Sequence, residues 1–404
     1  ENYAVDTLAS TVSSIGSSSA TGLQNSFLNA GDVLSVTVTF SENSPVTGTP
    51  QLTLAVGDDN RTADYTSSGS GDTTKVFKYT IQAGDNDSNG ISIRANALAL
   101  NGGTIMDLAE NNAILTHSVV DNNSSYKVDT TAPSVDNFTL SDTALKAGDN
   151  ATVTLVFSEA VASFSSAADI TVANGTLAVM TSTDNITWAG TFTPTANTED
   201  DNNTLSLATS YTDLAGNAGP AATSSSYVVD TKAPSVSSLQ LTDGVTTIST
   251  FTDRCLPVTS NIMVTFDDVM DLNYIQTNTS DTFCTSSEAG SILVSSNNFC
   301  DGEGCCVQMS FGDPEASNSN RTFTLDPNGN LSFYTTYKVR VTTGVKDVLG
   351  NNMSSQYDNS SGFKTSSYPS SSPISGVFVG VGQYGKAVRS IDNGTSWEDR
   401  KSVV

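Results

Sequence analysis

Val128-Asp-Thr-Thr-Ala-Pro-Ser-Val135 recurs almost unchanged as Val229-Asp-Thr-Lys-Ala-Pro-Ser-Val236. The two octapeptides begin 101 residues apart (229 − 128), which is the length of one β-sandwich domain and far more than one solenoid repeat. Proline fixes its own φ and pushes the residue before it into extended geometry, so Ala132 and Ala233 belong to stiff connections. The sequence therefore predicts similar domains joined end to end by short, rigid, acidic joints.

The same strand signal occurs in three segments of the chain. Apolar residues alternate with hydroxyl residues, as they do in a half-buried strand. The copies are Val33–Phe40, Ala151–Phe157 and Asn261–Phe266, and an acidic sequence follows each one: Ser41-Glu42, Ser158-Glu159 and Asp267-Asp268. This recurrence indicates an internal repeat.

A second shared element follows in each segment, before a final strand. It reads Asp107-Leu-Ala-Glu-Asn-Asn112, Asp213-Leu-Ala-Gly-Asn217 and Asp347-Val-Leu-Gly-Asn351. The final strands are expected at 125–128, 226–229 and 361–365. Long amphipathic helical windows are absent, and clusters of Gly, Asn, Asp and Ser separate the strands, as antiparallel sandwiches require.

The repeats predict the domain organisation. Domain one covers residues 1–129, domain two 133–230 and domain three 234–366. A linker rich in Ser, with two Pro, is expected at 367–375, and a separate C-terminal fragment at 376–404.

Composition narrows the possible partners. The chain has 17 Lys and Arg against 42 Asp and Glu, which gives a formal net charge of −25. Because phosphate binding needs clustered basic residues, nucleic acid is excluded as a partner. The acidic excess fits a soluble surface, high salt, or divalent cations held by carboxylates. No run approaches the roughly 20 apolar residues that span a bilayer, so no transmembrane segment is expected. Because the chain opens at Glu1 without an initiator Met or a signal sequence, we interpret it as a mature or trimmed fragment.

All five cysteines lie within 52 residues, and they are Cys255, Cys284, Cys300, Cys305 and Cys306. Their spacing does not fit a zinc site, so we expect disulfides in an oxidising compartment, with buried free thiols as the alternative. We predict at least one bridge, with Cys284 and Cys300 flanking a loop of about 15 residues. The adjacent Cys305 and Cys306 should point to opposite faces of a strand and not bridge each other.

Several motifs resemble a known family. Phe-Ser-Glu at 40–42 and 157–159, Asp-Leu-Ala-Gly-Asn at 213–217 and the Val-Asp-Thr-x-Ala-Pro joints resemble the tandem bacterial immunoglobulin-like domains of secreted adhesins and biofilm surface proteins. Domain three is similar to the related type of surface-layer and spirochaete-type exported proteins, on Ile262–Phe266, Tyr337–Val341 and Val345–Asn351. It departs by carrying a cysteine-rich insertion at about 284–306.

The tail resembles something else. Ser390-Ile-Asp-Asn-Gly-Thr-Ser-Trp397 is similar to an Asp-box, a structural hairpin of sialidase-type and photosystem-assembly-type β-propellers. A propeller needs about four blades, so these residues form either part of a longer protein or a lone hairpin. The fold class expected for the whole chain is all-β: tandem Ig-like antiparallel β-sandwiches in an elongated array, plus a C-terminal β-hairpin fragment.

Calcium is the metal that the carboxylates suit, because it takes six to eight oxygen ligands. The acidic motifs could converge at one pole of each sandwich, giving two predicted sites. The first would use Glu42, Asp107 and Asp129, and the second Glu159, Asp213 and Asp230. The alternative is that Asp-Leu-Ala-Gly-Asn is only a turn, in which Asp caps backbone N–H groups and Gly adopts the left-handed conformation.

An acidic loop and the sole histidine are two further candidate functional sites. The run Asp85-Asn-Asp87-Ser-Asn89-Gly90 begins like an EF-hand, but its twelfth position is Asn96 where that loop needs Glu, so a polar loop is favoured over calcium binding. His117, the sole histidine, is interpreted as an ordinary strand residue, because no nucleophile elbow or phosphate loop accompanies it. We therefore predict no enzymatic activity.

Two functional classes remain open. The favoured one is an extracellular structural or adhesive cell-surface protein, a stalk or filament-forming subunit whose partners are copies of itself, other surface or matrix components, or glycans. The alternative is the accessory stalk of a larger secreted, propeller-containing protein that binds or cleaves glycans. Edge strands with few Lys or Pro to protect them could pair with neighbouring subunits.

Overall fold

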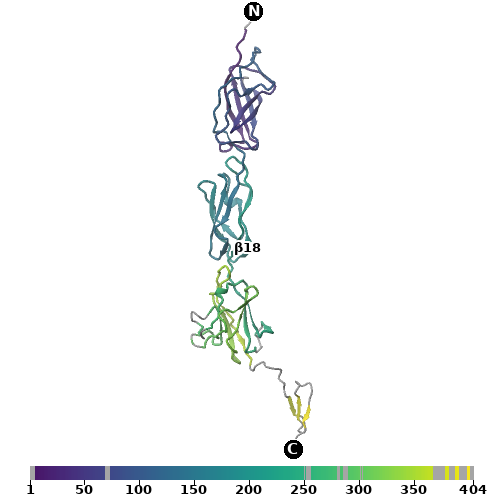
Figure 1. The fold of residues 1–404 in the computed structure, drawn as a ribbon, viewed down its shortest axis with the longest axis vertical. Coiled ribbons are helices and arrows are strands. Elements are labelled where there is room, and N and C mark those ends of the chain that lie inside the picture. The colour runs from purple at the N-terminus through teal and green to yellow at the C-terminus, as the bar shows by residue number, and fades with distance from the viewer. Residues whose placement is uncertain are drawn as a thin grey trace. The chain divides into compact units, whose positions relative to one another are not determined.

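The computed structural model describes residues 5–68, 73–249, 251, 256–279, 283–284, 290–300, 302, 304–366, 378–381, 387–390 and 398–400. Within these residues the protein is nearly all-β, as predicted, and its helices are limited to α1 (Ser166–Asp169) and the 3-10 helix η2 (Leu272–Tyr274). The chain divides into two compact units, Glu1–Thr231 and Lys232–Val404. The first contains two sandwiches, coloured from purple to teal in Figure 1, and the second begins with a third sandwich in green.

The first sandwich is built of eleven described strands. They are β1 (Val12–Thr21), β2 (Phe27–Leu28), β3 (Val33–Phe40), β4 (Val46–Thr47), β5 (Gln51–Val56), β6 (Asp59–Ser68), β7 (Thr74–Thr80), β8 (Asn86–Asp87), β9 (Leu98–Ala99), β10 (Thr104–Ile105) and β11 (Lys127–Asp129). The sheets have the orders β1-β3-β7-β6-β5-β9, β10-β4 and β2-β11-β8.

The period-2 pattern of β3 explains its place in this core. Leu34, Val36, Val38 and Phe40 are all buried, while the residues between them are only half-buried. The strand predicted at 33–40 is thus confirmed residue for residue. Its buried side chains belong to a single hydrophobic cluster that extends from Leu28 to Val128.

The second sandwich repeats this plan with fewer strands. They are β12 (Val135–Leu140), β13 (Ala144–Lys146), β14 (Ala151–Phe157), β15 (Ile170–Thr171), β16 (Gly175–Leu177), β17 (Thr187–Pro194), β18 (Glu199–Asn203), β19 (Ser206–Leu207), β20 (Ala222–Thr223) and β21 (Tyr227–Asp230). The sheets have the orders β12-β14-β17-β16, β13-β21-β18 and β15-β19-β20. Its own core cluster runs from Phe138 to Val229.

One pairing in each of these two sandwiches departs from the expected antiparallel pattern. The final strand β11 pairs in parallel with β2, and the final strand β21 pairs in parallel with β13. Both final strands also have an antiparallel partner, β8 and β18 respectively. The last strand of each sandwich, which carries the joint aspartate, is therefore held on both sides.

The third sandwich comprises β22 (Val236–Thr242), β23 (Thr247–Ile248), β24 (Asn261–Phe266), β25 (Ile292–Ser295), β26 (Glu315–Ser317), β27 (Thr322–Leu325), β28 (Thr336–Val341), β29 (Tyr357–Asp358) and β30 (Phe363–Lys364). One sheet has the order β23-β22-β24-β27-β26, and in the other β28 pairs with β25, β29 and β30. The core cluster runs from Leu239 to Phe363.

The cysteine-rich insertion of the third sandwich contains two disulfides, and they differ from the predicted pairing. Cys284 bonds to Cys306, and Cys300 bonds to Cys305. The bridge expected between Cys284 and Cys300 is therefore wrong, whereas the separation of the two adjacent cysteines is confirmed. Cys284, Cys305 and Cys306 cluster with Leu293 and Phe299, which gives the insertion a small core of its own. Cys255 lies outside the described residues.

The C-terminal segment contributes three described strands, β31 (Phe378–Val381), β32 (Ala387–Ser390) and β33 (Glu398–Arg400), in an antiparallel sheet of that order. It is thus one strand larger than the hairpin that was predicted. The Asp-box residues 391–397 and the linker residues 367–375 lie outside the described part of the chain. Among the described residues, no helix has the length and apolar character needed to cross a bilayer.

Candidate metal centre

The Asp-Leu-Ala-Gly-Asn motif of the second sandwich forms a tight turn around its first residue. Oδ1 of Asp213 accepts hydrogen bonds from the N–H groups of Ala215 at 2.8 Å and Asn217 at 2.9 Å. Its Oδ2 accepts one from Nδ2 of Asn217 at 2.8 Å. Gly216 lies in the left-handed region with φ of +90°, which glycine adopts without strain. The turn chemistry offered by the sequence is thereby confirmed.

The other two copies of the motif form the same turn. Asp107 binds the N–H groups of Ala109 at 2.8 Å and Asn111 at 2.9 Å, and Asp347 binds those of Leu349 and Asn351, each at 2.9 Å. All three aspartates are buried. A buried carboxylate that accepts several N–H bonds holds the loop in one conformation, so each turn presents its carboxylate at a fixed place.

The strand end that precedes each acidic residue is also fixed by a recurring pair of hydrogen bonds. The N–H of Ser158 donates to the carbonyl of Ser134 at 3.0 Å, and the N–H of Ser134 donates to Oγ of Ser158 at 2.9 Å. Thr11 and Ser41 form the same reciprocal pair in the first sandwich. Each joint is therefore tied to the strand end of the sandwich that it enters.

This geometry brings the predicted carboxylates together in a different grouping. Carboxylate oxygens of Asp129, Glu159 and Asp213 lie within 4.8 Å of one another. The sequence had grouped Asp129 with the pair from the first sandwich, and had placed Asp230 beside Glu159 and Asp213. The joint aspartate instead meets the acidic pair of the sandwich that follows it, because Asp129 lies only five residues before Ser134.

A second group contains Glu42 and Asp107, and its third member is Asp6, which the sequence analysis missed. Asp6 lies five residues before Thr11, just as Asp129 lies five before Ser134. Val5-Asp-Thr7 repeats the first three residues of the joints, and this was the available signal. The copy is incomplete, because Ser10 stands where the joints have proline.

Asp230 is buried at the end of β21, where it pairs with Lys146 of β13 and Glu199 of β18. It does not belong to the Glu159 and Asp213 group. The corresponding acidic residues of the third sandwich, Asp268 and Asp347, are buried within the second unit.

The three carboxylates at the joint repel one another. Burial raises the pKa of Glu159, and the nearby charges of Asp129 and Asp213 raise it further. The pKa of Asp107, the turn aspartate of the first sandwich, shifts in the opposite direction. Burial opposes the ionisation of Asp107, yet bonds from the side chain and N–H of Asn111 and from the N–H of Ala109 hold its pKa below the usual range. A cation at the joint would relieve the repulsion that Glu159 experiences.

The donor set of Asp129, Glu159 and Asp213 fits calcium. Calcium binds oxygen at roughly 2.3–2.6 Å, so two oxygens on one ion lie at most about 5 Å apart. The spread of 4.8 Å or less among the three carboxylates satisfies this limit. These three residues would hold the ion, and the remaining ligands would come from water or backbone carbonyls.

Side-chain amides clasp the same joint independently of any ion. Nδ2 of Asn25 and Nδ2 of Asn29, both in the first sandwich, donate to the carbonyls of Leu214 at 2.9 Å and Ala215 at 3.0 Å in the second. Nδ2 of Asn217 donates to the carbonyl of Asp129 at 3.0 Å. The turn that presents Asp213 is therefore also the surface that the first sandwich contacts.

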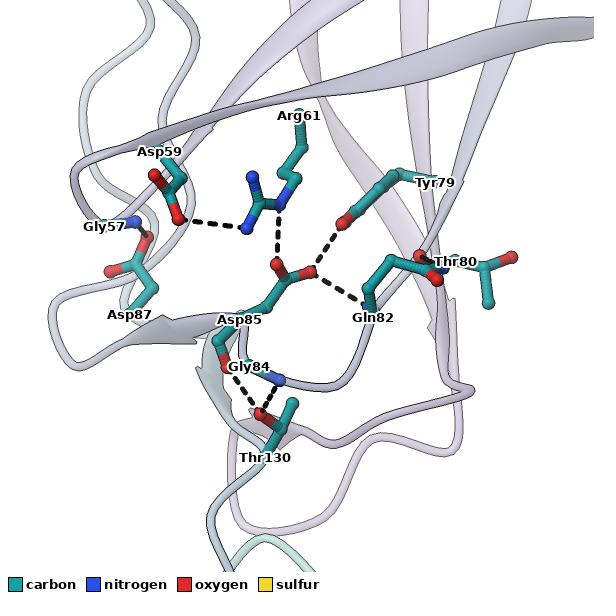
Figure 2. A network of polar contacts seen from close by, with 10 residues as sticks. All are labelled: Gly57, Asp59, Arg61, Tyr79, Thr80, Gln82, Gly84, Asp85, Asp87 and Thr130. Atoms are coloured by element: carbon teal, nitrogen blue, oxygen red, sulfur yellow. Dashed lines mark hydrogen bonds and ion pairs between the residues drawn. The ribbon is translucent and has the colours of Figure 1, made fainter.

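The Asp85 to Gly90 loop is a cross-linked polar loop, as the sequence favoured. Asp85 accepts from Nε of Arg61 at 2.6 Å, the hydroxyl of Tyr79 at 2.5 Å and the N–H of Gln82 at 2.9 Å (Figure 2). Burial opposes its ionisation, but these bonds hold the pKa of Asp85 below its usual value, while burial and the bond to Asp85 raise the pKa of Tyr79 to about 12. Protein donors thus already occupy this carboxylate.

His117 lies outside the named strands, so its interpretation as a strand residue is wrong, and it is bound to its neighbours. Its Nε2 accepts from the N–H of Ala97 at 2.8 Å, so Nδ1 carries the proton and donates to the carbonyl of Ser118 at 2.8 Å. Both ring nitrogens are therefore engaged by backbone groups, which matches a structural role.

Comparison with known proteins places part of this chain in a family. Residues 129–229 match a family model described as a bacterial Ig-like domain, and residues 230–365 match a second model with the same description. The chain contains two tandem bacterial Ig-like domains. The first sandwich lies before both matches, and they end before the tail, so the Asp-box resemblance stays a prediction.

Solved structures match the chain only at low similarity. The adhesin FdeC of Escherichia coli is 14% identical with a TM-score of 0.30, covering 87% of this chain and 95% of that one. The S-layer protein SbsC is 11% identical with a TM-score of 0.23, covering 95% of this chain and 57% of that one. At these scores the likeness carries no inference about function. No curated protein matches the chain.

Proposed function

We propose that this chain is an extracellular structural or adhesive protein of the bacterial cell surface, a stalk or filament-forming subunit whose Ig-like modules are stiffened by calcium. The two tandem bacterial Ig-like domains support the surface role. The convergence of Asp129, Glu159 and Asp213 at the joint between the first two sandwiches carries the proposal.

The three carboxylates of the joint would stiffen it by binding one calcium ion between two sandwiches. Asp129 belongs to the last strand of the first sandwich, whereas Glu159 and Asp213 belong to the second. An ion bound by all three would link the end of one sandwich to the next. Since the ion binds the folded arrangement, it would also stabilise that arrangement, by about 2.7 kcal/mol when calcium is a hundredfold above its dissociation constant.

The surface of the first sandwich supports contact with neighbouring copies or matrix components. Strand β1 occupies the end of its sheet, and its sequence Val-Ser-Ser-Ile-Gly-Ser-Ser-Ser-Ala-Thr contains neither a charged residue nor proline. This edge has no charged residue or proline to oppose strand pairing. Two register shifts against β3 twist it, and they are the feature of β1 that opposes pairing. Strand addition along β1 is the proposed mode of assembly.

Calcium and scattering measurements on the purified chain test the stalk proposal. Chelation with EDTA should lower the melting temperature and broaden the distribution of hydrodynamic radii, and calcium should restore both. Asp129→Asn should remove most of the response, whereas the control Asp121→Asn, an exposed carboxylate outside the group, should keep it. Identical melting and scattering with and without calcium would refute calcium stiffening.

The absence of enzymatic activity is part of the proposal. His117 is held by backbone groups through both nitrogens, and Asp85 is occupied by Arg61 and Tyr79. We expect no hydrolysis when the chain is incubated with sialosides or other glycans. Release of free sugar, detected by chromatography, would contradict this part.

A further inference from the structure

A polar cavity of about 540 Å³ lies in the first sandwich, near the joint. Its walls come from five places in the sequence: strand β2, the β5–β6 turn, the β8 strand with its following loop, the segment after residue 120, and strand β11. The lining residues are Phe27, Gly57, Asp58, Asn86, Asp87, Ser88, Asn89, Ser92, Asn122, Val128 and Asp129. The volume falls within the range of roughly 300–1,000 Å³ that is typical of small-molecule sites.

Asp87 cross-links two of these walls. This carboxylate is only 4% exposed, and Oδ2 accepts from the N–H of Gly57 at 2.8 Å. Its Oδ1 accepts from the N–H groups of Gly90 at 2.8 Å and Asn89 at 3.2 Å. Figure 2 shows the bond that ties the Gly57 turn to Asp87. The buried carboxylate therefore holds the turn and the loop at a fixed separation.

Two glycines bring the walls close together. A Cβ at Gly57 would lie 2.4 Å from the carbonyl oxygen of Asn86, and one at Gly90 would lie 2.0 Å from that of Asn123. Both residues have positive φ, at +57° and +100°. Only glycine permits this approach, so the segment that carries Asn122 packs directly on the loop. The cavity is thus preformed by backbone contacts.

The rim of this cavity carries polar side chains that make no hydrogen bond within the described protein. They are Asp58, Ser88, Asn89, Ser92 and Asn122. Amides and hydroxyls both donate and accept, whereas a carboxylate only accepts. The ring of Phe27 adds apolar surface, and Nζ of Lys127, 4.2 Å from its centroid, holds one face of that ring.

We infer that this cavity binds an uncharged, hydroxyl-rich ligand, namely a neutral saccharide. Vicinal hydroxyls match the mixture of donors and acceptors on the rim, and the C–H face of a sugar ring can pack on Phe27. The lining residues Asp58 and Asp87 carry carboxylates, which disfavour sialic acids, uronic acids and other anions. A cationic peptide would engage the carboxylates but leave the amide donors unused.

The cavity shares a residue with the candidate metal centre, because Asp129 lines one and belongs to the other. The joint is also bonded to the lining residue Asn86, whose Oδ1 accepts from the N–H of Thr130 at 3.3 Å. Just before that residue, Oγ1 of Thr130 accepts from the N–H of Gly84 at 2.9 Å and donates to the carbonyl of Asp85 at 3.0 Å (Figure 2). The inference rests on the proposed surface role in one respect, because a surface protein would encounter glycans outside the cell. Saccharide binding and calcium stiffening are measured separately, so a negative result for one does not refute the other.

The test is saturation-transfer NMR with the full chain and free saccharides at millimolar concentration. One arm uses N-acetyllactosamine oligomers, typical of host glycoproteins, and another uses N-acetylglucosamine oligomers, typical of bacterial envelopes. Binding in either arm supports the inference and identifies the source. Sialyllactose and an oligolysine peptide serve as the charged probes, and neither should bind comparably.

Variants locate the binding. Asn122→Ala combined with Ser92→Ala should weaken binding about tenfold, since two hydrogen bonds are lost. The matched control is Asn202→Ala, an exposed asparagine of the second sandwich, which should change nothing. Circular dichroism checks that each variant is folded. The inference is overturned if no neutral saccharide binds, if the double variant binds like the parent, or if only sialyllactose or oligolysine binds.

Discussion

The same turn occurs at the joint between the first two sandwiches and at the N-terminal pole of the first, but its surroundings differ. At the joint Leu214 is 38% exposed, and Asn25 and Asn29 bind the turn carbonyls. At the pole the equivalent Leu108 is 75% exposed. The internal hydrogen bonds are alike in both, with Asp213 and Asp107 each at 2.8 and 2.9 Å from two N–H groups. The motif itself thus fixes the turn, while the neighbouring sandwich adds burial.

The left-handed position of the two turns differs in residue type. Gly216 occupies it at the joint, where an added Cβ would lie 2.4 Å from Nε2 of Gln24. Glu110, with φ of +65°, occupies it at the pole. A side chain at this position meets no such contact in Glu110, whereas at Gly216 it would have to displace the side-chain amide of Gln24. The comparison predicts larger mutational effects at the joint than at the pole.

The largest effect should follow removal of a turn carboxylate. Asp213→Ala leaves the N–H groups of Ala215 and Asn217 without acceptors and should cost the second sandwich about 2–4 kcal/mol. Trp188 packs against the core of that sandwich, so its fluorescence during urea unfolding reports the loss in a Trp397→Phe background. A change under about 0.5 kcal/mol would show that the carboxylate does not hold the turn.

Substitutions at the left-handed position should change the free energy of unfolding in opposite directions in the two turns. Gly216→Ala is expected to destabilise the second sandwich by about 1–2 kcal/mol, because it adds both left-handed strain and a contact with Gln24. Glu110→Gly removes strain and should stabilise the first sandwich by about 0.5–1 kcal/mol. Thermal unfolding of both variants measures this. Equal effects of the same sign would contradict the distinction between joint and pole.

The amide clasp should affect the joint more than the sandwiches. Asn25→Ala with Asn29→Ala removes two bonds to the second sandwich, so the hydrodynamic radius distribution should broaden while the unfolding of the second sandwich shifts by under about 1 kcal/mol. Asn202→Ala is the control, since it contacts no joint residue among the described hydrogen bonds. Unchanged scattering would mean that these bonds do not restrain the joint.

The smallest effect concerns pH. The pKa of Glu159 is raised in the folded protein by burial and by its neighbours, so its ionisation weakens the folded state. In EDTA, stability from this group should be present below its unfolded pKa and be lost as pH rises through the folded value. Glu159→Gln should flatten that slope above the ordinary pKa of glutamate, about 4.3. Melting curves at several pH values measure it, and a slope unaltered by the substitution would exclude this contribution.

The sequence predicted local secondary structure and turns better than contacts between residues far apart in the chain. The strand at 33–40 and the turn at Asp213 follow from alternation and from Asp, Gly and Asn chemistry, and both depend on adjacent residues only. The carboxylate grouping depends on which sandwich the joint aspartate faces. The fixed distance from Asp129 to the Ser134 pairing settles this, but only once that pairing is known.

The cysteines illustrate the same limit. Loop length made Cys284 and Cys300 plausible partners, yet Cys300 bonds to Cys305 only five residues away, and Cys284 reaches Cys306. Cys305 and Cys306 do not bridge each other, as the sequence predicted, but they lie in a bend and not in the predicted strand. The fold of the insertion determines which partner Cys305 and Cys306 each bond to, and the local sequence does not predict that pairing.

The most direct test of the central claim is a double-mutant cycle on calcium-induced stabilisation of the second sandwich, followed by Trp188 fluorescence. If one ion is held by the joint and the sandwich together, Asp129→Asn and Glu159→Gln each remove most of the calcium-dependent rise in melting temperature, and the double variant adds little more. If Asp129→Asn leaves that rise intact, the joint aspartate does not hold the ion, and calcium stiffening of this joint is contradicted.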